Sequence, residues 1–332
     1  MIVERLAGGT CGRPFPVYEN LLGNLVAAHG SADAGRDAVV AHVLGTCSGY
    51  AYADTETVAM IAARLGLEGS ACVRIAQIVD AMHIFSTAYL VQSRCGRAAI
   101  LCYRGTEPAN LGNWLTDADV GSGSLSLGGD VLAVHAGMLR NVRSTLRAVV
   151  DELNLALQGR SLRDPWQSVE RPLEALYVAG HSLGGAMAVL FALCLAGMAE
   201  HREIAGKLRA IYTFGQPLVS GEPLPEAARE VGRKLYRHVN ARDLIPGLPP
   251  AAWGHLAHFG REYRYAAGEW RQAEVPVTQV ANLREVPRAL LAFFGTAKRR
   301  DSFRYTMDEH GPHHYIAALR PRGRLDEFGD PG

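Results

Sequence analysis

Residues 180–184 form the segment whose residue types and spacing point most directly to chemistry. Gly180-His181-Ser182-Leu183-Gly184 fits the pattern Gly-x-Ser-x-Gly, which places a serine on a tight turn between a strand and a helix. Glycines flank the serine because a Cβ would clash where the helix passes close to the strand. Ser182 is therefore a candidate nucleophile, and the N-terminus of the following helix favours negative charge that develops beside it.

The flanking sequence strengthens this prediction. A β-type apolar run, Leu173 to Ala179, leads into the motif, and an apolar stretch predicted as a helix, Gly184 to Met198, follows it. Strand, turn and helix in this order are the context that the motif requires. The alternative is a glycine-rich turn that carries an unreactive serine.

A serine hydroxyl is a weak nucleophile at neutral pH and needs a base. Enzymes built on this turn place an acid and then a histidine after the serine. Asp243 lies in the loop between the predicted strand Lys234–Val239 and a proline turn at Pro246, so it is the candidate acid; the alternative is that it caps a turn. That order leaves five of the twelve histidines: His255, His258, His310, His313 and His314.

The elements that must position these side chains follow from the hydrophobic pattern. Helical spacing of apolar residues predicts helices within Tyr18–Val26, Ala38–Leu44 and Thr55–Leu65, and turn residues between Ala88–Gln92 and Ala98–Tyr103 predict a hairpin. Further on, strands alternate with helices, which predicts parallel strands with helical crossovers on both faces of a sheet. The fold class is therefore α/β, with a mostly parallel central sheet.

No Pro/Ser-rich linker divides the chain, so we expect one elaborated domain. Residues 1–85 are predicted to be an N-terminal helical extension packed on the core, and residues 86–332 the catalytic domain. Within the second part, residues 253–300 are a candidate cap or lid, because Arg288 to Gly295 form an apolar patch with a basic edge. The Gly/Ser-rich segment 121–129 is predicted to be a loop.

Composition excludes several classes of protein. The formal net charge of +1 over 332 residues argues against a nucleic-acid surface, which needs a basic field. The six cysteines show no C-x-x-C spacing, so no zinc or redox motif is predicted.

The start of the chain has no apolar h-region, and the apolar run from residue 186 to 199 is too short to cross a bilayer. We therefore expect a cytoplasmic protein, unless a leaderless route exports it.

Several further segments match one family in order. They are Tyr103-Arg104-Gly105-Thr106-Glu107, Asn113 to Asp117, Val134 to Gly137, Gly180 to Gly185, Thr213-Phe214-Gly215-Gln216-Pro217, and Asn240 to Pro250. With these segments the chain resembles the class 3 lipases, the family of fungal triacylglycerol lipases and their relatives within the α/β hydrolases. The resemblance runs from about Ala88 to Leu319, and the first 85 or so residues match nothing in that family.

The resemblance implies the remaining site residues. It assigns the catalytic histidine to His310, which keeps a five-residue step to Tyr315, and leaves His313 as the rival. The tetrahedral intermediate of ester hydrolysis needs oxyanion donors. The backbone N–H of Leu183 is one donor, as the motif itself requires. The resemblance makes Thr106 the other.

The resemblance also implies a function. We expect hydrolysis of carboxylic esters of lipids through an acyl-enzyme, in which Ser182 attacks the ester, His310 transfers the proton and Asp243 orients His310. No metal or organic cofactor is expected. The expected partners are a lipid ester and a transient membrane or lipid-droplet surface; the sequence leaves oligomeric state open. The alternatives are a phospholipase A1-type enzyme with the same machinery and a non-catalytic lipid-binding protein on the same fold.

Overall fold

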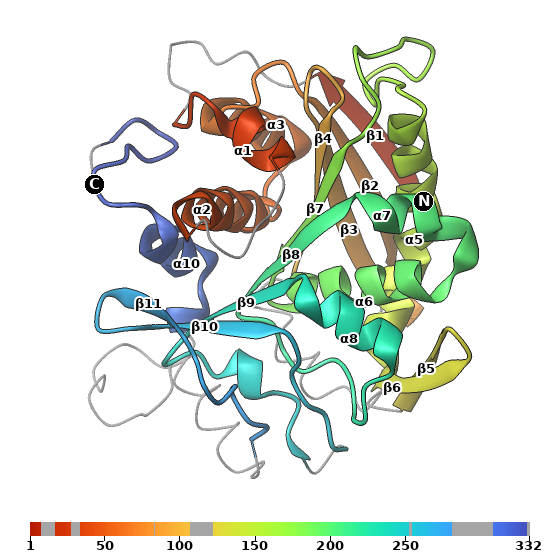
Figure 1. Ribbon diagram of the computed structural model, residues 1–332, viewed down its shortest axis with the longest axis vertical. Helices are drawn as coiled ribbons and strands as arrows, with labels where there is room; N and C mark the ends of the chain where they lie inside the picture. The colour runs from red at the N-terminus through yellow and green to blue at the C-terminus, as the bar shows by residue number, and fades with distance from the viewer. Residues whose placement is uncertain are drawn as a thin grey trace.

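The computed structural model describes residues 1–7, 17–27, 34–82, 84–106, 122–251, 254–280 and 308–330. Its described strands form a nine-stranded sheet in the order β1-β2-β3-β4-β7-β8-β9-β10-β11 and a separate two-stranded ribbon of β5 and β6 (Figure 1). The strands are β1 (Ile2–Ala7), β2 (Ala71–Val79), β3 (Ile84–Gln92), β4 (Ala98–Tyr103), β5 (Ser122–Leu127), β6 (Asp130–His135), β7 (Ala175–His181), β8 (Leu208–Phe214), β9 (Leu235–Asn240), β10 (Arg261–Ala266) and β11 (Glu269–Gln272).

The centre of the large sheet is parallel and its flanks are antiparallel. Strands β4, β7, β8, β9 and β10 pair in parallel, each with the next. The run β1-β2-β3-β4 on one side and the pair β10-β11 on the other are antiparallel. Parallel neighbours point their carboxyl ends to the same edge, so the residues that follow β4, β7, β8 and β9 are brought together.

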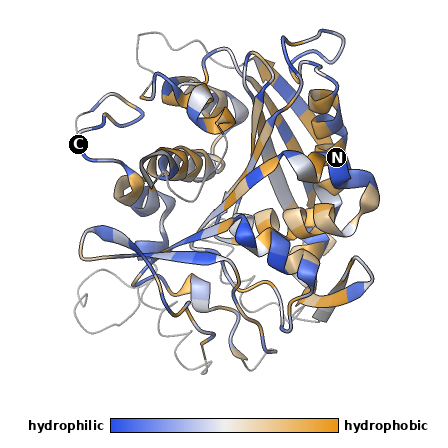
Figure 2. Cartoon of the chain, in the orientation of Figure 1, coloured by the Kyte–Doolittle hydropathy of each residue, from blue (hydrophilic) through white to orange (hydrophobic). Residues whose placement is uncertain are grey.

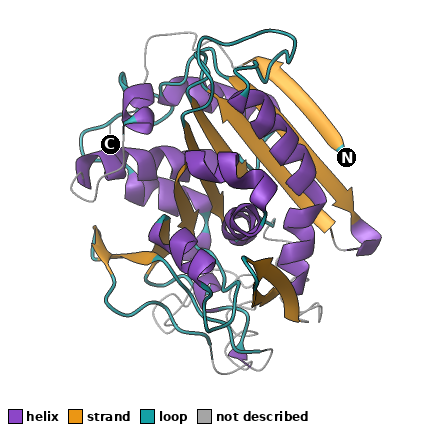
Figure 3. Ribbon diagram, turned by 45° about the vertical axis from the view of Figure 1, so that its right-hand side comes forward, coloured by secondary structure: helices purple, strands orange, loops and turns teal. Residues whose placement is uncertain are grey.

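Helices cover both faces of the sheet, as the alternation of elements predicts (Figures 1 and 3). One hydrophobic cluster joins α1, α2, α3 and α10 to one face, and a second joins α5, α6, α7 and α8 to the other. The helices are α1 (Leu21–Val26), α2 (Ala34–Tyr50), α3 (Thr55–Leu65), α5 (Ala136–Leu157), α6 (Leu183–Gly197), α7 (Arg202–Lys207), α8 (Glu226–Arg233) and α10 (Pro312–Leu319), with short 3₁₀ turns at 80–82, 199–201, 245–247 and 308–310.

The sequence of β7 and α6 reflects their central place. All seven residues of β7 are buried; Leu176 and Val178 face one hydrophobic cluster while Tyr177 and Ala179 face the other. A strand covered on both faces reads as a continuous apolar run. Helix α6 is buried from Leu183 to Leu195, and Figure 2 shows it in mostly hydrophobic colours. A helix that is apolar all round belongs in the core.

Among the described residues, no single helix has both the length and the apolar character needed to cross a membrane. Helix α6 taken with residues 199–207 passes that test, but the two parts meet at a bend of 106°.

The predicted N-terminal extension needs correction. Its three predicted helices are present as α1, α2 and α3, but β1 and β2 lie in the same stretch and belong to the large sheet. The predicted boundary after residue 85 falls inside β3 (Ile84–Gln92). Strand β1 was missed because its place is set by pairing with β2, from Ile2 opposite Ala76 to Ala7 opposite Ala71, rather than by its own pattern.

Two other predictions also need correction, because the predicted loop and the candidate lid both contain strands. The Gly/Ser-rich segment 121–129, predicted as a loop, contains β5, which pairs with β6. Within the candidate lid 253–300, strands β10 and β11 extend the central sheet, so residues 261–272 are not part of a lid. The apolar patch from Arg288 to Gly295 lies outside the described residues.

Candidate active site

Ser182 occupies a strained turn at the centre of the sheet. It stands between the last residue of β7, His181, and the first residue of α6, Leu183, with φ 58° and ψ −132°. A non-glycine residue with these angles costs on the order of 1–3 kcal/mol and is held only by its surroundings. The backbone N–H of Ser182 donates to the carbonyl oxygen of Phe214 at 2.9 Å, which ties the turn to the end of β8.

The glycines beside Ser182 allow close backbone packing. A Cβ on Gly180 would lie 2.2 Å from the carbonyl group of Gly184, and a Cβ on Gly184 would lie 2.2 Å from the carbonyl oxygen of Tyr103. Neither position therefore admits a larger residue. The second contact also presses the end of β4 against the first turn of α6, which brings the segment before Thr106 close to Ser182.

Asp243 and His310 form a buried pair at the same edge of the sheet. His310 Nδ1 lies 2.8 Å from Asp243 Oδ2, while the other carboxylate oxygen accepts the N–H of Ile245 at 2.9 Å. Asp243 is 3% exposed and His310 is 7% exposed. Because a carboxylate oxygen accepts, Nδ1 carries the proton and Nε2 is left with its lone pair. This is the tautomer that a general base for a serine requires.

Tyr315 on α10 completes the surroundings of the acid. Its hydroxyl donates to Asp243 Oδ2 at 2.6 Å and accepts the backbone N–H of Asn240 at 3.1 Å. Burial first, and then the neighbouring Asp243 carboxylate, raise the pKa of Tyr315 well above its ordinary value, so this hydroxyl stays protonated and remains a donor.

The segment that carries His310 is fixed by main-chain contacts. The Asn240 side chain donates to the carbonyl oxygen of Glu309 at 2.8 Å. The carbonyl oxygen of His310 itself lies 2.6 Å from His181 Nε2, and the two imidazole rings lie 4.6 Å apart. His310 is thereby attached to the residue directly before Ser182.

Gly215 lies next to all three predicted catalytic residues. Gly215 has φ 62°, and a Cβ there would lie 2.7 Å from Asp243 Oδ2 and 2.9 Å from His310 Nδ1. The preceding residue, Phe214, accepts the N–H of Ser182. The serine turn, the carboxylate and the imidazole therefore surround one point beyond the carboxyl end of β8. Ser182 Oγ and His310 Nε2 are both buried and have no hydrogen-bond partner among the described residues.

The two predicted oxyanion donors lie beside this arrangement. Leu183 is the first residue of α6, so its N–H has no partner within the helix. Thr106 is half-buried and follows Gly105, whose Cβ would lie 2.6 Å from the carbonyl oxygen of His181. Glycine at 105 thus lets the segment after β4 pass close to the serine turn.

The rival histidine lies elsewhere. His313 is in the first turn of α10, its ring lies 4.1 Å from that of His314 at a tilt of 40°, and it lines a cavity of about 410 Å³ with Tyr50 and Asp326. The hydrogen bond to Asp243 is made by His310 instead. No group of three or more metal-ligating side chains occurs in the part of the chain that the structure describes.

Sequence reasoning missed some residues that the structure brings to the site. Tyr315 was noted for its spacing from His310 but not as a partner of the acid. His181 and Tyr52 were not considered; Tyr52 Oη lies 2.9 Å from His181 Nδ1. The five-residue spacing between His310 and Tyr315 could have indicated that Tyr315 lies near the site. No feature of the sequence around Tyr52 indicates its contact with His181.

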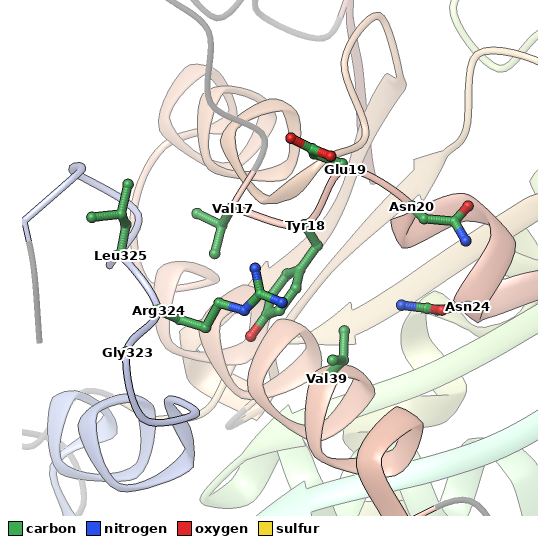
Figure 4. Close-up of a pocket in the computed structure, with 9 residues that line it drawn as sticks. All are labelled: Val17, Tyr18, Glu19, Asn20, Asn24, Val39, Gly323, Arg324 and Leu325. Carbon is green, nitrogen blue, oxygen red and sulfur yellow. The ribbon is translucent and has the colours of Figure 1, made fainter.

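Another cavity lies away from this arrangement. It has a volume of about 450 Å³ and is lined by residues 17–20, Asn24 of α1, Val39 of α2 and the C-terminal segment 323–325. Figure 4 shows how these side chains lie. None of Ser182, Asp243 and His310 lines it.

The family model described as Lipase (class 3) matches residues 100–253 of the chain. A triacylglycerol lipase of Ricinus communis is 25% identical over 216 residues, which cover 54% of this chain and 40% of the relative. A lipase of Rhizomucor miehei is 41% identical over 97 residues, which cover 29% of this chain and 26% of the relative. The chain thus spans less than half the length of both curated relatives.

The same fold is present among solved structures. The crystal structure of a lipase from Rhizopus microsporus var. chinensis aligns with 85% of this chain and 88% of its own, with 18% sequence identity and a TM-score of 0.52. At that identity the likeness concerns the fold, which is that of the α/β hydrolases.

Proposed function

Because this chain belongs to the class 3 lipase family of the α/β hydrolases, we propose that it hydrolyses carboxylic esters of lipids with Ser182 as nucleophile, His310 as general base and Asp243 as the orienting acid. The observation that carries the proposal is the hydrogen bond of 2.8 Å between Asp243 and His310 next to the strained Ser182. A serine, a correctly protonated imidazole and a buried carboxylate at one strand edge are the parts that acyl transfer requires.

The acylation step follows from the tautomer of His310. Nε2 takes the proton of the Ser182 hydroxyl while Oγ forms a bond to the ester carbonyl carbon. The carbonyl oxygen becomes an oxyanion, which the N–H of Leu183 and the N–H and hydroxyl of Thr106 stabilise. When the tetrahedral intermediate collapses, His310 returns the proton to the leaving alcohol and the acyl group stays on Ser182.

Deacylation repeats these steps with water. His310 Nε2 removes a proton from the water molecule as its oxygen attacks the acyl carbon, and then gives the proton back to Ser182 Oγ. The fatty acid leaves and the enzyme is restored. The Asp243 carboxyl group is held by the N–H of Ile245 and the hydroxyl of Tyr315, and it orients and stabilises the transient imidazolium.

The proposed substrates are lipid esters, with a lipid surface as the place of contact. The names of the Ricinus and Rhizomucor relatives support lipid esters as a class, since both are called lipases.

Covalent labelling and turnover test the proposal together. We expect a fluorophosphonate probe to label Ser182 and the wild-type protein to hydrolyse p-nitrophenyl acyl esters. Ser182→Ala should abolish both, with turnover falling by a factor on the order of 10⁶. Unchanged turnover in Ser182→Ala would make the assignment of the nucleophile wrong, and wild-type protein that neither labels nor turns over would favour a non-catalytic lipid-binding role.

The head group is decided by a second comparison. Fatty-acid release from triglyceride emulsions is measured beside release from phosphatidylcholine vesicles at equal ester concentration. Preference for the emulsion identifies a triacylglycerol lipase, and preference for the vesicle with release of the sn-1 acyl chain identifies a phospholipase A1-type enzyme.

A further inference from the structure

His181 connects the histidine of the proposed triad to the N-terminal region. It precedes Ser182 directly, its side chain is buried, and its ring lies 4.6 Å from the ring of His310 at a tilt of 35°. Its two nitrogens have different partners. Nε2 lies 2.6 Å from the carbonyl oxygen of His310, and Nδ1 lies 2.9 Å from the hydroxyl of Tyr52.

The partners of His181 fix the direction of these hydrogen bonds. A carbonyl oxygen only accepts, so Nε2 carries the proton. Burial, and then the neighbouring His310, lower the pKa of His181 well below its ordinary value, so the ring is neutral and Nδ1 keeps its lone pair. The Tyr52 hydroxyl must therefore donate to Nδ1. The chain of donors runs from Tyr52 through His181 to the main chain of His310.

Tyr52 also contacts the segment that leads to Thr106. A Cβ on Gly105 would lie 2.1 Å from the Tyr52 hydroxyl, and the guanidinium carbon of Arg104 lies 5.9 Å from the centre of the Tyr52 ring. Tyr52 itself comes from the turn between α2 and α3, next but one before Asp54, whose side chain caps α3. The turn between α2 and α3 thus places the Tyr52 hydroxyl between Gly105, which precedes the proposed oxyanion donor Thr106, and His181.

We propose that Tyr52 is a positioning residue that holds His310 in its working geometry through His181, an inference that rests on the proposed ester hydrolysis. Without the Tyr52 hydroxyl, one of two things must happen at His181. Either the buried lone pair of Nδ1 is left without a donor, or the proton moves from Nε2 to Nδ1 and the hydrogen bond to the His310 carbonyl is lost. Either choice loosens the segment that carries the general base, and misplacement by about 1 Å can cost up to a hundredfold in rate.

The test compares Tyr52→Phe with a matched variant, Tyr50→Phe. Tyr50 lies two residues earlier and its hydroxyl donates to Glu327 at 2.8 Å instead of to His181. We expect Tyr52→Phe to lower kcat about tenfold or more with KM within about twofold, because geometry rather than substrate affinity is lost. Tyr50→Phe should keep the wild-type kcat.

Two further measurements separate positioning from a general loss of packing. In nitrogen-15 NMR of the histidine side chains, Tyr52→Phe should shift the Nδ1 and Nε2 signals of His181, and Tyr50→Phe should not. In a double-mutant cycle, Tyr52→Phe should cost nothing further in a His181→Gln background, because the path through His181 is already broken.

The outcomes distinguish this inference from the proposed function. An active wild type with Tyr52→Phe equal to Tyr50→Phe in kcat overturns the role of Tyr52 alone. Full additivity of Tyr52→Phe and His181→Gln also overturns it, even if Tyr52→Phe by itself is poorly folded. A wild type without turnover or probe labelling overturns both proposals.

Discussion

The Tyr315 hydroxyl donates to Asp243 Oδ2 at 2.6 Å, the same oxygen that accepts the Nδ1 proton of His310 at 2.8 Å. One carboxylate oxygen thus receives two donors from two places in the C-terminal segment. Tyr315 also accepts the N–H of Asn240, so α10 is tied to the end of β9 and to the acid at once. The short step from His310 to Tyr315 in the sequence is explained by this shared acceptor.

Removing the Tyr315 hydroxyl should weaken both stability and turnover. In Tyr315→Phe the buried N–H of Asn240 loses its acceptor, which costs about 1–3 kcal/mol of unfolding free energy. The carboxylate loses one of its donors and holds His310 less firmly, so kcat/KM should fall by about tenfold. Urea denaturation and ester turnover measure the two effects. Wild-type stability in Tyr315→Phe would contradict the Asn240 contact.

Gly215 should tolerate no side chain. The Cβ of Gly215→Ala would meet Asp243 Oδ2 at 2.7 Å and His310 Nδ1 at 2.9 Å, so we expect kcat to fall by about a hundredfold as the pair is pushed apart. Gly128→Ala is the matched control, since Gly128 has nearly the same φ of 60° but nothing within 4 Å of a Cβ. The control should show only the backbone strain, about 1 kcal/mol, and wild-type kcat. Equal kcat in the two variants would place the catalytic pair elsewhere.

The hydroxyl of Thr106 should matter for rate and little for affinity. Thr106→Val keeps the shape and the backbone N–H but removes one oxyanion donor, so kcat should fall by about 10²–10³-fold with KM nearly unchanged. Thr106→Ser restores the hydroxyl and should recover most of the rate. Steady-state kinetics on one soluble ester decide the matter; an active Thr106→Val enzyme would exclude the hydroxyl as a donor.

Buried histidines should make the protein sensitive to acid. Burial lowers the pKa of His238 to about 3 and that of His42 to about 4, whereas in the unfolded chain histidine titrates near 6.5. Between these values the unfolded state binds more protons, so stability is lost as pH falls below about 6.5. Each such group contributes up to about 1.4 kcal/mol per pH unit.

His238→Phe isolates one of these contributions. His238 stacks on Phe214 at 5.3 Å and on Tyr263 at 5.4 Å, so a phenyl ring fits the same aromatic surroundings without a titrating group. The difference in unfolding free energy between variant and wild type should grow in the variant's favour as pH falls from 6.5 to 4. A difference that stays constant over this interval would mean that His238 does not titrate on unfolding.

Local pattern predicted the central elements well and the sheet edges poorly. Strand β7 and helix α6 were expected within two residues of their observed bounds because an apolar strand, a glycine turn and an apolar helix each leave a signal in their own residues. Strands β1 and β5 leave no such signal. The backbone of β1 is held by hydrogen bonds to β2, which lies far along the chain, and that of β5 by hydrogen bonds to β6, its partner in a hairpin that turns at Gly128 and Gly129.

By itself the sequence identified Ser182, Asp243 and His310 as candidates, because a turn motif, the end of a strand and a family pattern are all local. Only the tertiary structure showed that Asp243 is hydrogen-bonded to His310 and not to His313. Only the tertiary structure showed that Tyr315 contacts Asp243 and that Tyr52 contacts His181. Hydrogen bonds act over about 3 Å in space, whereas Tyr52 and His181 are 129 positions apart in the chain, so no spacing in the sequence encodes their contact.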